Sequence, residues 1–401
     1  CLLATYRGYL QGIEEMKTLA ISQVIEQLVN VVLSLIFAFV LVGISIEWGS
    51  AGGTVGTTIG AIVALIFILI IYDRNRLEER AEEENKAEKH ISDKMILKKL
   101  VKYGVPIIMV AALQNSSGMI DTINVKGRLL AAGFNDNRAT ELYGILGCYN
   151  TLLYVPLSIV TALSSAIFPR IINAFQTKKK KELKSHIASS FSLTYLITIP
   201  AAVGLSMLSK EVYIMIYGGT EGYQLLMYGS VVLIFMSLSA IQNTILQGIN
   251  KLYLVLSTAF LSIIIKFVIN YFLVGIKDIN ILGAVFASFF AFLVPVIINH
   301  NRLRRIFKMR IPIVKMALVP LLASCVMALS ISLCKIPINR FMNIVQGGRA
   351  ITSIVALMLI AIGGAVYFVA MIFLGGIKKK DLDMISPKLF TLLPRFLRKN
   401  M

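Results

Sequence analysis

The chain has 401 residues, of which 57% are hydrophobic and 15% are charged, and its mean hydropathy is +0.78. A soluble domain of this length carries far less apolar sequence, so the composition excludes that class and indicates a polytopic membrane protein. The four cysteines follow no motif spacing, so neither a disulfide framework nor a metal site is expected.

Apolar stretches of about 20 residues recur along the chain and predict membrane-spanning helices. They lack the alternation of barrel strands, and in lipid only a helix or a closed barrel satisfies every backbone group. We therefore expect an all-α fold. A helix end at residues 1–10 is followed by ten complete spans, expected at 17–44, 51–72, 101–124, 145–169, 187–209, 224–248, 253–276, 281–300, 312–334 and 350–374.

The basic residues alternate between successive loops. Of the 40 Lys and Arg residues, 31 lie in one set of alternate loops and in the C-terminal tail, 8 lie in the other set, and Lys266 lies within a span. The positive-inside rule places the first set and the C-terminus in the bacterial cytoplasm, so loop 178–181 is expected inside and loop 335–349 outside. Anionic membrane lipids then account for the net charge of +19, without a nucleic acid.

A short run occurs twice, as Leu10-Gln11-Gly12-Ile13 and as Leu246-Gln247-Gly248-Ile249. Later landmarks keep the same order, which predicts an internal duplication. An even number of spans separates the copies, so the halves run parallel, as in one class of transporters with a site between two lobes. We expect residues 1–100 to be the end of a first six-helix lobe with a charged connection, 101–311 a second lobe, and 312–401 a helix pair with a basic tail. By the same spacing, we expect about 135 further residues before residue 1 and about fourteen helices in all.

The Gly52-x-x-x-Gly56-x-x-x-Gly60 pattern has no preceding strand and no Lys-Ser/Thr ending, so it is not a phosphate loop. Its four-residue spacing favours close helix packing. The three histidines are isolated, and no metal-binding or nucleophile motif occurs, so neither an enzyme nor a cofactor is expected.

Polar side chains within the expected spans carry the functional signal, because each is costly in lipid unless it faces protein or water. One interpretation is that they hold helices together by hydrogen bonds, which we favour for Gln23, Gln27, Asn30 and the Gln242–Asn243 pair. The other is that they line a cavity, and for Glu26, Asp121 and Lys266 the two interpretations weigh about equally. The candidate cavity residues are Gln114, Asn115, Asp121, Arg128, Glu26, Asn30, Lys266 and Asn270. Asp121 and Gln114 are expected to face the space between the lobes.

Three segments carry a family resemblance: Tyr6-Arg7-Gly8-Tyr9-Leu10-Gln11-Gly12, residues 20–27 and residues 124–134. They resemble the stage V sporulation protein B group of polysaccharide biosynthesis proteins. This group belongs to the multidrug/oligosaccharidyl-lipid/polysaccharide superfamily, which includes lipid II flippases. The resemblance implies a MATE-like bundle of two lobes around a central cavity. It also implies substrate-binding arginines in two helices that precede this chain, and a cavity arginine that the span 145–169 lacks.

The expected function is translocation of an undecaprenyl-linked saccharide, such as peptidoglycan lipid II or a surface-polysaccharide unit, by alternating access. Cell-wall synthesis proteins are candidate partners. A cation-coupled drug or metabolite antiporter is the alternative and would use a carboxylate such as Asp121 or Glu26. A membrane glycan polymerase is a third, disfavoured by the short outer loops. The resemblance further implies an apolar groove for the lipid tail beside the last two spans, walled by Ala323, Ala328, Gly363 and Gly364.

Overall fold

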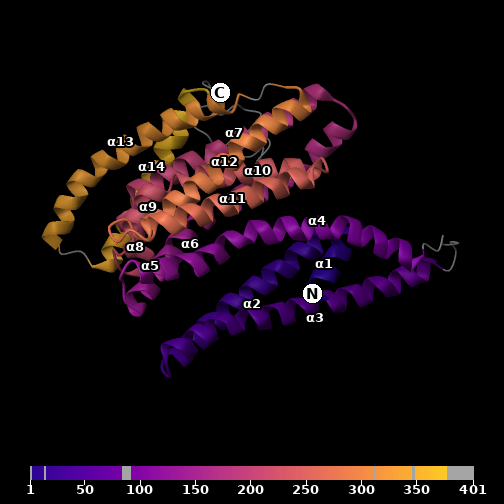
Figure 1. The fold of residues 1–401 in the computed structure, drawn as a ribbon, viewed down its shortest axis with the longest axis horizontal. Helices are drawn as coiled ribbons and strands as arrows, with labels where there is room; N and C mark the ends of the chain where they lie inside the picture. The colour runs from indigo at the N-terminus through magenta and orange to yellow at the C-terminus, as the bar shows by residue number, and fades with distance from the viewer. Residues whose placement is uncertain (1, 13–14, 84–91, 310–311, 346–347, 377–401) are drawn as a thin grey trace. The chain divides into compact units, whose positions relative to one another are not determined.

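A computed structural model describes residues 2–12, 15–83, 92–309, 312–345 and 348–376 (Figure 1). Within these ranges every regular element is a helix, which confirms the all-α prediction. The chain divides into two compact units, Cys1–Asp93 and Lys94–Met401, and each is considered by itself.

The first unit contains α1 (Leu2–Gly12), α2 (Met16–Val42) and α3 (Ile46–Glu83). Three glycines of α3 face the backbone of α2. A Cβ atom added to Gly52 would lie 2.7 Å from the carbonyl oxygen of Phe37, and one added to Gly60 would lie 2.7 Å from that of Glu26. Larger side chains would therefore push the two helices apart, which confirms that the glycine pattern serves helix packing.

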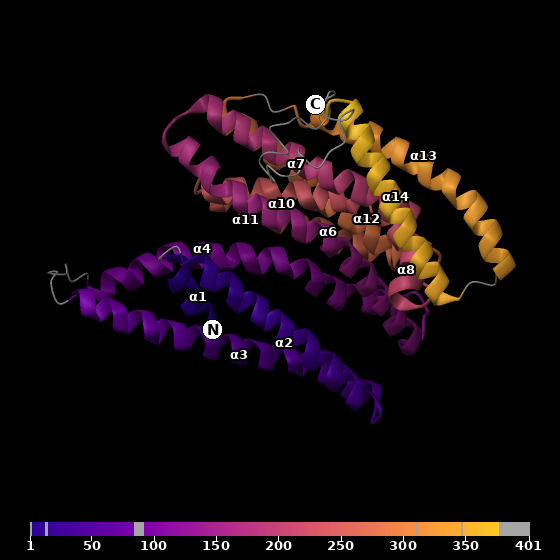
Figure 2. The same ribbon diagram turned by 180° about the vertical axis from the view of Figure 1, so that it is seen from behind.

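The second unit contains the remaining helices and one π-helical turn, η1. In chain order they are α4 (Asp93–Ile120), η1 (Asp121–Val125), α5 (Lys126–Ala131), α6 (Asp136–Gln176), α7 (Lys180–Met207), α8 (Ser209–Tyr217), α9 (Tyr223–Gly229), α10 (Val232–Gly248), α11 (Leu252–Leu273), α12 (Leu282–Phe307), α13 (Ile313–Val345) and α14 (Arg349–Phe373). Figure 2 shows the same ribbon from behind. Helices α6, α7, α10, α11 and α12 form the bundle, and α13 and α14 pack on each other and on α7 and α8.

Eight helices in the described ranges are long and apolar enough to cross a membrane, and a ninth span is counted if α9 and α10 are taken together. Our expectation of ten spans differs at two places. The range 224–248 is divided into α9 and α10, which are bent by 57°. The range 101–124 is helical but falls outside this set, because its Gln114-Asn115-Ser116-Ser117 run makes it more polar.

The bend between α9 and α10 follows Gly229. Its carbonyl oxygen accepts a hydrogen bond of 3.0 Å from the hydroxyl of Tyr149 on α6. A Cβ atom on Gly229 would lie 2.5 Å from that hydroxyl and 2.7 Å from Val285 on α12, so a larger side chain does not fit. A distant side chain thus satisfies a carbonyl group at the break, as a backbone at membrane depth requires.

The duplication inferred from the sequence has matching helix boundaries. Helices α1 and α10 end at Gly12 and Gly248. Helices α2 and α11 begin at Met16 and Leu252, and α3 and α12 begin at Ile46 and Leu282. Each pair of positions is 236 residues apart, the same spacing as the repeated Leu-Gln-Gly run. The two copies therefore share one helical plan.

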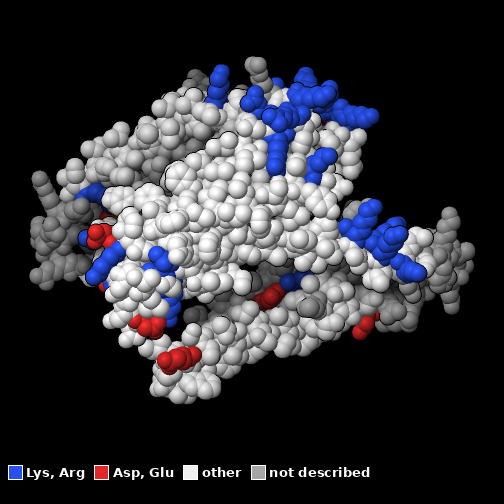
Figure 3. Space-filling model, viewed as in Figure 1, with Lys and Arg blue, Asp and Glu red and all other residues white. Residues whose placement is uncertain are grey.

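Turns that carry basic residues meet at one end of the second unit. The rings of Phe175 and Phe307 lie 5.9 Å apart, and Arg302 Nη1 donates to the carbonyl oxygen of Leu254 at 2.9 Å. These contacts bring together the α6–α7 turn, the start of α11 and the end of α12. Figure 3 shows Lys and Arg gathered over this end of the unit. At the other end, the Tyr217 hydroxyl donates to the carbonyl oxygen of Cys148 at 2.9 Å. Arg349 Nη2 donates to the carbonyl oxygen of Ile216 at 3.0 Å.

The expected tail groove needs a correction. Ala323 is fully buried in an apolar cluster, and a Cβ atom on Gly363 would lie 2.9 Å from Ile331. These two positions therefore lie in helix contacts and do not open to lipid. Ala328 is half-buried, and Gly364 is exposed with no heavy atom near its Cβ position.

Candidate functional site

Helix α4 does not end at Asp121 but continues through the π-helical turn η1 into α5. A π-helical turn holds one residue more than an α-helical turn, and such turns are frequent at functional sites. In η1 the side chains of Asp121, Asn124 and Val125 are buried. The first two reach α11, which starts more than a hundred residues later in the chain.

Asp121 forms the centre of this contact. Lys266 Nζ lies 2.6 Å from Asp121 Oδ2, and Asn270 Nδ2 donates to Asp121 Oδ1 at 3.0 Å. Asn124 Nδ2 donates to the carbonyl oxygen of Phe267 at 3.0 Å. The structure therefore brings together three of the predicted cavity residues, Asp121, Lys266 and Asn270.

Burial makes the two charges depend on each other. The side chains of Lys266 and Asp121 are only 5% and 6% exposed. Taking an ion out of water costs several kcal/mol, and this cost is offset only when the partner and further hydrogen bonds are in place. Here each carboxylate oxygen of Asp121 has its own donor, so the pair is stable in the bundle.

Arg128, a further predicted cavity residue, packs α5 against the C-terminal end of α11. Its guanidinium carbon lies 4.1 Å from the centre of the Tyr271 ring, within the range of a cation–π contact. A Cβ atom on Gly275 would lie 2.6 Å from Arg128 Nη2, so glycine leaves the space that the guanidinium fills.

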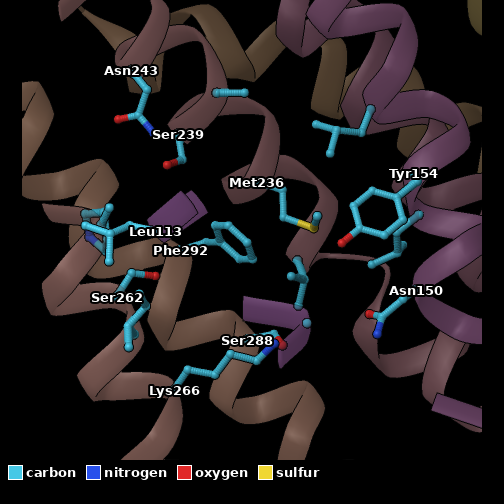
Figure 4. Close-up of a pocket in the computed structure, with 18 of the residues that line it drawn as sticks. Leu113, Asn150, Tyr154, Met236, Ser239, Asn243, Ser262, Lys266, Ser288 and Phe292 are labelled. Atoms are coloured by element: carbon cyan, nitrogen blue, oxygen red, sulfur yellow. The ribbon is translucent and has the colours of Figure 1, made fainter. Parts of the chain in front are cut away.

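The ion pair lies on the wall of a cavity of about 340 Å³. Residues of α4, η1, α6, α10, α11 and α12 line it, all within the second unit. In the close-up, Asn243 and Ser239 lie on one side, Asn150 and Tyr154 on the other, and Met236 and Phe292 between them (Figure 4). Among the described lining residues, Asp121 and Lys266 are the only charged ones.

The two predicted residues of the first unit have different surroundings. Glu26 Oε2 lies 2.7 Å from Arg7 Nη2, and Arg7 Nε donates to Ser22 Oγ at 3.2 Å. Asn30 Oδ1 accepts hydrogen bonds from Ser34 and Thr57, at 2.9 and 3.1 Å. Since Thr57 belongs to α3, Asn30 holds α2 and α3 together, as the first of our two interpretations proposes.

Some predictions stay open and some residues were missed. The side chains of Gln114 and Asn115 lie outside the described residues, so their place in the cavity stays a prediction. Asn150 and Tyr154 were missed because each is isolated in an apolar span. Arg7 was counted only as a loop charge, and no local spacing links it to Glu26. Within the described ranges, no group of three or more His, Cys, Asp or Glu side chains could hold a metal ion.

Comparison with known proteins agrees with this architecture. Residues 2–175 match the family described as polysaccharide biosynthesis protein. The chain is 27% identical over 298 residues to the lipid II flippase MurJ of Bacillus subtilis (strain 168). The aligned region covers 72% of this chain and 54% of that protein. It therefore spans about half the length of this relative.

Solved structures share the fold. A lipid II flippase MurJ in an inward closed conformation superposes with a TM-score of 0.61 at 18% identity, over 88% of this chain and 67% of the other. A MATE structure in a bent conformation gives a TM-score of 0.57 at 15% identity, and the superposition covers 79% of this chain and 66% of the other. Both agree with an all-α polytopic membrane fold of the predicted type.

Proposed function

Because this chain is related to polysaccharide biosynthesis proteins and lipid flippases, we propose that it moves an undecaprenyl-linked saccharide across the bacterial cytoplasmic membrane. Transport proceeds by alternating access, with no covalent chemistry. The observation that carries the proposal is the cavity in the second unit, whose lining includes polar side chains and the buried Asp121–Lys266 pair. Polar and ionisable groups are retained inside a membrane bundle where a polar substrate must pass.

The same ion pair favours a flippase over a cation-coupled antiporter. An antiporter needs a carboxylate that binds and releases its coupling ion. Both candidates are already bound to a basic side chain, Asp121 to Lys266 at 2.6 Å and Glu26 to Arg7 at 2.7 Å. A fixed ammonium or guanidinium group occupies the position that a mobile cation would need.

The orientation belongs to this proposal. The end of the second unit where α6, α11 and α12 bring basic residues together faces the cytoplasm and anionic lipid, and the end with Cys148 faces outward. The C-terminal tail is then cytoplasmic. A long isoprenoid tail would lie beside α13 and α14, on the side where Gly364 is exposed.

Reconstitution tests the proposal directly. The natural protein that contains this chain is placed in liposomes with a fluorescent undecaprenyl-pyrophosphoryl saccharide, and a membrane-impermeant quencher reports how much label crosses the bilayer. We expect flipping above the rate in protein-free liposomes, and a reduced rate for Asp121→Asn relative to the amount of folded protein. No flipping, together with cation-driven efflux of a drug from the same liposomes, would establish the antiporter instead.

A further inference from the structure

The cavity in the second unit has no net charge on its described walls. The carboxylate of Asp121 and the ammonium of Lys266 neutralise each other at 2.6 Å, and the other described lining side chains are uncharged. A charged group brought into this space would lose its hydration without gaining a free counter-charge from the described walls. The cavity therefore suits an uncharged ligand.

Amide groups that can donate and accept lie on two sides of the cavity (Figure 4). The side chains of Asn150 and Gln247 have no hydrogen-bond partner among the described residues. Asn243 Oδ1 accepts from Asn299 Nδ2 at 3.1 Å, which fixes the amide and leaves its own N–H groups for another acceptor. These residues belong to α6 and α10.

Hydroxyl groups supply acceptors on α11 and α12. Ser262 Oγ donates to the carbonyl oxygen of Ala291 at 2.6 Å, and Ser288 Oγ donates to that of Ala284 at 2.9 Å. With its proton engaged in this way, each hydroxyl keeps lone pairs that can accept from a ligand. Donors and acceptors thus lie around one space.

Apolar faces complete the lining. Met236 and Phe292 lie between the two polar sides, and the ring of Tyr154 lies beside Asn150 (Figure 4). The space of about 340 Å³ is at the lower end of the range for small-molecule pockets.

We propose that this cavity is a binding subsite for an uncharged sugar residue of the lipid-linked substrate, an inference that rests on the proposed function. Each sugar hydroxyl donates and accepts hydrogen bonds, which matches a lining that contains both amide groups and hydroxyl oxygens. The C–H faces of a pyranose ring match the apolar side chains. The phosphate groups lie outside this subsite because it has no free cation on its described walls. The isoprenoid tail lies outside it because polar side chains interrupt the apolar lining.

Binding to lipids that differ only in the sugar tests the subsite. The natural protein in nanodiscs is titrated with undecaprenyl pyrophosphate, with undecaprenyl-pyrophosphoryl-N-acetylglucosamine and with the matching lipid that carries an uronic acid. Two or three additional hydrogen bonds predict about tenfold tighter binding of the neutral sugar lipid than of the sugar-free lipid. The uronic acid should gain less than the neutral sugar.

Variants locate the effect. Asn150→Leu removes an amide that has no other described partner, so it should weaken binding of the neutral sugar lipid about fivefold and leave undecaprenyl pyrophosphate unchanged. Asn137→Leu, at an exposed position of the same helix, is the matched control and should change neither. Thermal unfolding of both variants shows that each is folded.

The outcomes separate the two proposals. If sugar-bearing and sugar-free lipids bind equally, or if the uronic acid binds best, the sugar subsite is wrong while the flippase stands. If none of the three lipids binds, the proposed function fails and the subsite fails with it. If Asn150→Leu weakens the binding of all three lipids alike, the cavity does not recognise the sugar.

Discussion

Replacing Lys266 with methionine keeps most of the apolar stem but removes the ammonium group, which leaves the carboxylate of Asp121 buried without its partner. The side chains of this pair are 5% and 6% exposed, so water does not replace the lost contact. Breaking a buried ion pair from one side costs about 3–5 kcal/mol of stability. Asp121→Asn, which leaves the ammonium group buried instead, should cost a similar amount.

The double variant distinguishes a coupled pair from two separate losses. With methionine at 266 and asparagine at 121, no charge is buried, and Asn270 can still donate to the new amide. We expect it to lose only about 1 kcal/mol relative to the parent, which gives a coupling energy of at least about 5 kcal/mol. Equilibrium unfolding in mixed micelles, followed by circular dichroism, measures all four proteins.

An exposed pair provides the control for this cycle. Lys179 and Glu182 lie 3.2 Å apart with side chains 59% and 55% exposed, so Lys179→Met should change stability by less than about 0.5 kcal/mol. If Lys266→Met costs no more than this control, or if the two single losses simply add in the double variant, the buried pair does not have the role assigned here.

Three further outcomes follow from the geometry. Gly56→Leu should separate α2 from α3 and lower the thermal unfolding temperature by several degrees. Gly53→Leu should be nearly neutral, because no heavy atom lies within 4 Å of the Cβ position of Gly53. Equal losses of stability in the two variants would contradict the packing role of Gly56. Ala323→Trp should unfold part of the protein because this position is fully buried. Gly364→Trp, at an exposed position, should leave a folded protein that flips lipid slowly. Normal flipping by Gly364→Trp would argue against the tail groove. A cysteine at position 179 should react with an impermeant reagent only in opened cells, and labelling in intact cells would reverse the orientation.

The helical plan could be predicted because apolar length and basic loops are strong signals in membrane proteins. The duplication was visible in a short repeated run, and the helix boundaries at Met16 and Leu252 agree with it. The bend after Gly229 was not predicted, since the range 224–248 is one continuous apolar segment. The contact that allows it comes from Tyr149, 80 residues earlier in the chain.

Sequence reasoning found Asp121 and Lys266 because a charge within an apolar span needs a partner. It did not pair them, since they are 145 residues apart and no local spacing connects them. The turn η1 has no compositional signature, so the inward position of Asn124 could not be predicted. The polar lining of the cavity was missed for a related reason. Single Asn, Ser and Tyr residues in apolar spans are common, and Asn243 was interpreted, with Gln242, as holding helices together. Only the fold brings Asn150 and Asn243 to the same space.

The Tyr149–Gly229 hydrogen bond limits how the bundle can rearrange. If α6 slid past the break between α9 and α10, a carbonyl group would be left unsatisfied at membrane depth, at a cost of several kcal/mol. The tight contact of Gly229 with Val285 also binds this point to α12. In the proposed transport cycle we therefore expect α6, α9 and the start of α10 to move together.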